Sequence, residues 1–298
     1  MWVSIVEWTV LERLYADAAS RAFVVESVRG VLAGTPVSRS WQHRFVAPLF
    51  VSLLGGDLDA ALERARLVLL LASNGLLSWL ALRRGSWTRA LGVVAVYVAG
   101  RLLLAYKLEY GWDGVDQLLF LGFGALAAEE RGVGSAWPLL ALGAVNHETI
   151  FYAPLWYLLS FERARVRDGE LASLAIGAAV LGLRQAFYRG RPSLPGQTFE
   201  EGLPLVDNHL HVAHNLRQLF VEDWTSGRAH VALGFFGAVA AFAWMCARPS
   251  LRRGGAWSLV VLATIVCFGY VNETRRYLVL LAFWCAYAAT KAPRRSPA

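Results

Sequence analysis

Apolar segments follow one another along almost the whole chain, and charged residues interrupt most of them. A helix that crosses a bilayer needs about 20 mainly apolar residues. Only residues 229–247 and 254–272 are free of charge over that length, whereas 67–82, 150–161 and 171–183 are shorter and are bounded by Arg or Glu. A charged side chain beside hydrocarbon is costly on an isolated helix, so we expect a bundle whose charged side chains face a protein-lined or watery interior.

The first 56 residues are predicted to form a separate helical segment. Apolar residues recur there at helical spacing among charged residues, which is typical of a helix in the membrane interface. The apolar residues are Val3, Val6, Val10, Leu11 and Leu14; Glu7 and Arg13 lie between them, and Asp17 follows. No positively charged stretch precedes an apolar core, which argues against a signal peptide. Residues 45–54 are apolar but too short to span. We therefore expect residues 1–56 to form an amphipathic, interfacial segment on the outer face.

Residues 57–298 are predicted to form an all-α, polytopic transmembrane bundle of about eight to nine membrane segments. Basic residues in short loops favour the cytoplasmic side. Placing Arg83, Arg84 and Arg89 inside, and letting the chain alternate, puts the other basic loops and the C-terminal tail inside as well. The candidate spans are 67–83, 89–107, 115–129, 133–147, 149–161, 171–187, 229–247, 256–272 and 276–290.

This topology leaves the polar turns on the outer face of a multi-pass protein of the cytoplasmic (inner) membrane. The outer set contains residues 109–117 (EYGWDGVDQ), the NHET turn at 146–149, a long loop at 188–228 and the NETRR turn at 272–276. The two segments around His147 are short for full spans. A single helix there would invert the topology of all later segments.

The composition agrees with a membrane protein and excludes a soluble globular enzyme. Of 298 residues, 56% are hydrophobic and 17% are charged, against about 45–50% and 25% in soluble domains; the mean hydropathy is +0.43. The net charge of +7 comes from 29 basic and 22 acidic residues. Because the basic residues form no block, no nucleic-acid partner is expected. The 3 cysteines show no CxxC spacing, so neither a disulfide framework nor a zinc site is indicated.

Two carboxylates in the first polar turn are the first candidates for chemistry. Asp113 and Asp116 are three residues apart at the predicted start of a helix, which places them on one face about one turn apart. Such a pair can hold a divalent ion or act as a general base. The alternative is helix capping, with Asp113 as the N-cap and Asp116 as its first-turn complement.

The two later turns bring further charged residues to the same face. Glu148 follows His147, and Glu273 precedes Arg275 and Arg276. Capping chemistry would also account for the Asn and Glu of these turns.

Arg101 lies inside a predicted span, where an unpaired guanidinium would be costly. We expect it to have either a carboxylate partner, such as Asp113 or Glu148, or an anionic ligand. Guanidinium groups suit bidentate contacts with phosphate.

The arrangement of these polar stretches is similar to that of the GT-C superfamily, whose members are polytopic glycosyltransferases that take sugars from polyprenyl-phosphate carriers at the outer membrane face. The stretches that carry the resemblance are WQHRFVAPLF (41–50), WDGVD (112–116), NHET (146–149) and NETRRYL (272–278). The family's catalytic acid characteristically lies in the first outer loop, where this chain offers only Asp17 and Glu26. Either the catalytic role has moved to Asp113 and Asp116, or the chain is a degenerate, N-terminally shortened relative.

The resemblance implies a catalytic set, a phosphate-binding set and a mechanism. The catalytic candidates are Asp113, Asp116, Glu148 and Glu273, and the phosphate-binding candidates are Arg101, Arg275, Arg276 and His147. Asp113 or Asp116 would deprotonate an acceptor hydroxyl, and the arginines would stabilise the leaving lipid phosphate in a single inverting displacement. No metal ligand set is assigned, although a divalent ion is a candidate cofactor. The expected partners are membrane lipids, a polyprenyl-phosphate carrier and other membrane subunits.

Two other functions remain as alternatives. The first is a non-catalytic subunit of a larger membrane complex, in which the 12 Trp, 10 Tyr and 15 Phe would serve packing and interfacial anchoring. The second is a transporter, which is less favoured because two similar turns at one face do not make an inverted repeat. Convergence of the charged residues on one outer-facing site would favour an enzyme, and separate ion pairs would favour a subunit.

Overall fold

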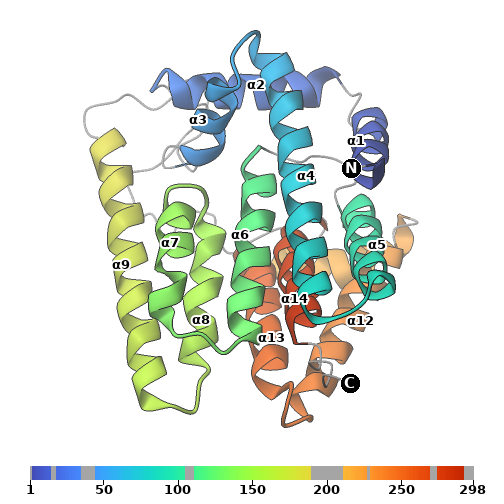
Figure 1. Cartoon of the computed structure of the whole chain (residues 1–298), viewed down its shortest axis with the longest axis vertical. Helices are drawn as coiled ribbons and strands as arrows, with labels where there is room; N and C mark the ends of the chain where they lie inside the picture. The colour runs from blue at the N-terminus through green and yellow to red at the C-terminus, as the bar shows by residue number, and fades with distance from the viewer. Residues whose placement is uncertain are drawn as a thin grey trace.

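A computed structural model describes residues 2–14, 18–34, 44–104, 111–188, 211–226, 229–268 and 274–291. Over these ranges the regular structure is entirely helical, which confirms the predicted all-α class. The long helices run side by side, and connections alternate between the two ends of the bundle (Figure 1).

Three helices form the N-terminal segment: α1 (Trp2–Leu14), α2 (Ala18–Leu32) and α3 (Val46–Leu53). Helix α2 lies across one end of the bundle, with α3 beneath it, whereas α1 stands beside α4 and α5 (Figure 1). Val28 of α2 packs with Val51 of α3 and with Ala61 and Ala65 of α4. The N-terminal segment is therefore attached to the bundle by a small apolar core of its own.

Each of the predicted spans overlaps a helix. The helices are α4 (Leu58–Arg84), α5 (Trp87–Leu104), α6 (Gly111–Ala128), α7 (Val133–Ala144), α8 (Tyr152–Leu158), α9 (Arg163–Tyr188), α12 (Ala229–Cys246), α13 (Arg252–Phe268) and α14 (Leu278–Thr290). Shorter elements lie at the polar turns: η2 (Glu148–Phe151), α10 (Val212–Arg217), η3 (Gln218–Glu222), α11 (Asp223–Thr225) and η4 (Thr274–Tyr277).

Within the described ranges, three helices are long and apolar enough to cross a membrane: Leu58–Arg83, Trp87–Leu104 and Ala229–Cys246. Helices α7 and α14 are apolar but shorter. Only 6% of the apolar window of α12 is buried inside the protein, so this helix presents an apolar surface outward. The finer count of eight to nine spans stays a prediction.

The centre of the bundle is built by α6 and α14. Phe123 of α6 packs on Phe283 of α14, and the Phe283 ring lies 4.2 Å, centroid to centroid, from that of Trp257 on α13. Gly124 permits this contact, because a Cβ at that position would lie 2.4 Å from the carbonyl oxygen of Phe283.

Replacing Gly124 by Ala is expected to lower the free energy of unfolding by about 1–3 kcal/mol, the usual cost of overpacking a core. The measurement is the thermal midpoint of the detergent-solubilised protein. Gly92→Ala is the matched control, since a Cβ on Gly92 meets nothing within 4 Å. Equal midpoints for the two variants would contradict this packing argument.

Basic residues gather at the end of the bundle opposite α2. Arg253 donates to the carbonyl oxygen of Trp156, Arg89 donates to that of Ala288, and Lys291 pairs with Glu130. These contacts link the end of α14 and four connections to one another at this end of the bundle: α4–α5, α6–α7, α8–α9 and α12–α13 (Figure 1). The predicted grouping of the basic loops at one end is therefore seen in the fold.

Candidate functional site

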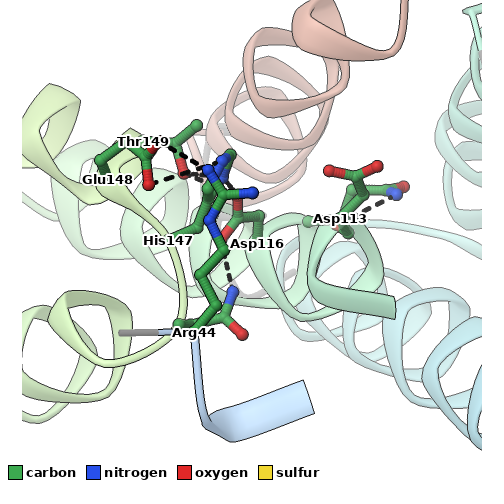
Figure 2. A network of polar contacts seen from close by, with 8 residues as sticks. Arg44, Asp113, Asp116, His147, Glu148 and Thr149 are labelled. Carbon is green, nitrogen blue, oxygen red and sulfur yellow. Dashed lines mark hydrogen bonds and ion pairs between the residues drawn. The ribbon is translucent and has the colours of Figure 1, made fainter. Parts of the chain in front are cut away.

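The carboxylate of Asp116 is the centre of a polar cluster at the end of the bundle opposite these basic loops. Its Oδ1 accepts a hydrogen bond from Asn146 Nδ2 at 2.7 Å. Its Oδ2 accepts one from Thr149 Oγ1 at 2.6 Å and lies 2.5 Å from His147 Nδ1. Figure 2 shows the side chains of Asp116, His147 and Thr149 converging. Asp116 is only 4% exposed, so these contacts fix a carboxylate that water hardly reaches.

The two segments that form this cluster are shaped by local sequence. Helix α6 begins at Gly111, so Asp113 and Asp116 lie in its first turns, as the sequence predicted. Helix α7 ends at Ala144, and the amides of Asn146 and His147 both donate to the carbonyl of Gly143. A Cβ on Gly143 would lie 2.3 Å from the Ile150 side chain. A glycine at this position therefore lets the turn fold back tightly and bring His147 to Asp116.

A hydrogen bond from Nδ1 of His147 to the Asp116 carboxylate requires the imidazole proton to be on Nδ1. An ionised carboxylate can only accept, so the ring nitrogen facing Asp116 is the donor. Thr149 Oγ1 lies 3.1 Å from the same nitrogen. The other ring nitrogen, Nε2, is then unprotonated in the neutral ring, and it lies 3.8 Å from Glu148 Oε2.

Arg44 is a site residue to which the sequence analysis gave no role. Its guanidinium donates to Glu148 Oε1 at 2.6 Å, and its side chain is 7% exposed. The amide of Phe45 donates to the carbonyl of Val145, and Ala47 of α3 packs against α6. Figure 2 shows Arg44 reaching toward His147 and Glu148. The only sequence signal is an arginine placed directly before the apolar run 45–54.

Asp113 lies to one side of this group (Figure 2). One ligand atom each from Asp113, Asp116 and His147 fall within 4.8 Å of one another. Two carboxylates and an imidazole suit a divalent ion such as Mn²⁺ or Zn²⁺. A cation bound there through Nδ1 would take the place of the proton that His147 shares with Asp116.

In the structure Arg101 forms an ion pair with Glu7, whereas the sequence suggested Asp113 or Glu148 as its partner. The Nε atom of Arg101 lies 2.7 Å from Glu7 Oε1, and both side chains are at most 1% exposed. The expected ion pair is therefore buried within the protein, and it joins α5 to α1; the predicted phosphate-binding role of Arg101 stays a prediction.

Arg276 and two residues of the cluster act electrostatically on the same tyrosine. The charge of Arg276 acts on the hydroxyl of Tyr152, as do the charges of Glu148 and Asp116. Tyr152 of α8 is held against α13 by two hydrogen bonds. Thr264 Oγ1 donates to the Tyr152 hydroxyl at 3.1 Å, and the Trp257 indole donates to the Tyr152 carbonyl oxygen. Glu273 and the side chain of Arg275 lie outside the described residues, so their predicted roles stay predictions.

Comparisons of this chain with models of known families, with curated proteins and with solved structures find no match. The resemblance to the GT-C superfamily therefore stays a prediction, and the case for a function depends on the cluster itself.

Proposed function

We propose that this protein is an integral membrane transferase that uses a lipid-phosphate-linked sugar, with its active centre at Asp116 and His147. The observation that carries the proposal is the hydrogen-bonded Asp116–His147 pair. A buried carboxylate that orients an imidazole is a recurrent way of building a general base. A capping role would not by itself call for histidine.

The distribution of basic residues supports an extracytoplasmic site. Arg89, Arg253 and Lys291 make their contacts at the opposite end of the bundle, and basic loops favour the cytoplasm. In this orientation the C-terminus is cytoplasmic and the Asp116 cluster lies at the side of the outer leaflet, where lipid-linked sugars are available.

In the proposed reaction, Nε2 of His147 takes the proton of an acceptor hydroxyl as its oxygen bonds to the anomeric carbon. Asp116 stabilises the imidazolium that forms. The bond from the anomeric carbon to the phosphate oxygen breaks at the same time, and the carrier phosphate leaves with the electron pair. Arg44 and Arg276 supply positive charge for that phosphate. Displacement from the opposite face gives inversion.

The test is a transfer assay on protein reconstituted in liposomes with a polyprenyl-phosphate-linked sugar. We expect release of free polyprenyl phosphate by the wild type and background release by the Asp113→Asn/Asp116→Asn double variant. The control is Asp168→Asn, a change of the same chemistry on α9. Equal release by wild type and double variant over a panel of sugars would overturn the proposal.

A chelator distinguishes proton transfer by Asp116 and His147 from metal binding by the same side chains. Because the dyad accepts the proton and arginines offset the phosphate charge, we expect transfer to continue in EDTA at a rate within about twofold of the untreated protein. Loss of transfer in EDTA with recovery on adding Mn²⁺ would instead assign Asp113, Asp116 and His147 to metal ligation.

A non-catalytic subunit is the second candidate, and two ion pairs, one buried and one half-buried, favour it. Arg101 is paired with Glu7, and Arg44 is paired with Glu148, as expected where charges serve packing. Co-purification of the intact protein from its native membrane distinguishes this function. A stoichiometric membrane partner, combined with no transfer by the isolated chain, would favour it.

A further inference from the structure

Helix α1 has its polar face inside and its apolar face outside. The buried side of α1 contains Ser4, Glu7 and Leu11, which are at most 1% exposed. Their spacing of three and four residues places them on one helical face. Val3, Val6 and Val10 follow a similar spacing on a neighbouring side of the helix and are 44%, 60% and 37% exposed. A helix on the surface of a soluble protein, or one lying in the membrane interface, turns its charged face toward water.

The polar face of α1 contacts the middle of a helix that is long enough to span. Asn74 of α4 donates to Ser4 Oγ at 3.0 Å and to Glu7 Oε2 at 2.9 Å. Asn74 lies within the charge-free run 67–82, about 12 Å along the helix from Arg66 and about 13 Å from Arg83. In a bilayer that contact falls near mid-depth.

The contacts of Arg101 and Leu11 fix the position of α1 along the same helices. Arg101 of α5 pairs with Glu7, and Leu11 packs on Leu70 of α4. The charges of the pair are covered by α1, α4 and α5, which is the arrangement expected for ionisable groups at membrane depth.

We infer that α1 is a lipid-immersed half-span: Val3, Val6 and Val10 contact acyl chains, and the Glu7–Arg101 pair holds the helix on α4 and α5. The inference rests on the membrane placement in the proposed function and not on its chemistry. It also revises the interfacial location predicted for residues 1–56, for α1 alone.

The experiment measures lipid exposure by electron paramagnetic resonance. Cys246, Cys267 and Cys285 are replaced by Ala, a nitroxide is attached to a single Val6→Cys substitution, and the protein is placed in phospholipid nanodiscs. We expect relaxation of the label by oxygen to exceed relaxation by the water-soluble complex nickel ethylenediaminediacetate.

Two control positions distinguish failure of the α1 inference from failure of the membrane placement. Ala240→Cys lies on the exposed face of the α12 span, and Glu162→Cys lies in the exposed basic loop before α9. A nickel-accessible label at Val6 with an oxygen-accessible label at Ala240 would overturn the inference alone. Nickel accessibility at both Val6 and Ala240 would overturn the membrane placement as well.

Discussion

Replacing His147 by Gln is expected to slow transfer by about 10²- to 10⁴-fold, the usual contribution of a positioned general base. Asp116→Asn should have an effect of the same order, because a neutral amide cannot stabilise the imidazolium. Its NH2 group would also donate a hydrogen bond where the carboxylate oxygen accepts one. The two residues act as one unit, so the double variant should be no slower than the worse single variant. The measurement is the initial rate of polyprenyl phosphate release at saturating donor.

The matched control is His230→Gln, which changes an exposed histidine at the start of α12. It should retain the wild-type rate. Strictly additive losses from His147→Gln and Asp116→Asn would contradict the dyad. They would indicate that each side chain acts on a different part of the substrate.

Removing one partner of the Glu7–Arg101 pair is expected to destabilise the protein by about 3–5 kcal/mol, because the other charge stays buried and unpaired. We expect Glu7→Gln to show this loss as a lower free energy of unfolding in mixed micelles. The double variant Glu7→Gln/Arg101→Met should recover much of it, since no buried charge then remains.

The exposed pair Glu26–Arg29 on α2 provides the contrast. Both of its side chains are more than half exposed, and exposed pairs are worth about 0–1 kcal/mol. Glu26→Gln should therefore change the free energy of unfolding by less than about 1 kcal/mol. An equal effect of Glu7→Gln and Glu26→Gln would show that the first pair is not buried in the folded protein.

The sequence was informative wherever local spacing decides structure. The interval between Asp113 and Asp116 predicts a shared helix face, and charge-bounded apolar runs predict the helices that the fold contains. The topology argument also brought His147 and Glu148 to the same end of the bundle as Asp116, and the structure places His147 against it.

Contacts between distant segments could not be predicted in the same way. The need of Arg101 for a partner follows from the cost of desolvating its charge. That the partner is Glu7, which lies 94 positions earlier in the chain, depends on how α1 docks. Arg44 meets Glu148 across 104 positions, and no periodicity links the two. For α1, the predicted apolar stripe is divided: Val3, Val6 and Val10 face outward, whereas Leu11 is buried on the same side as Glu7.

The close packing of α14 on α6 has a consequence for the order of assembly. Asp116 and the residues that orient it come from one short stretch of chain, so the cluster can form as soon as α6 and the turn after α7 have been made. The apolar side of α6, by contrast, receives Phe283 from α14, which is made after all the other described helices. Until then Phe123 contacts Tyr157 of α8 but lacks its partner on α14, and a nascent chain that stalls before α14 is expected to be a substrate for membrane quality control.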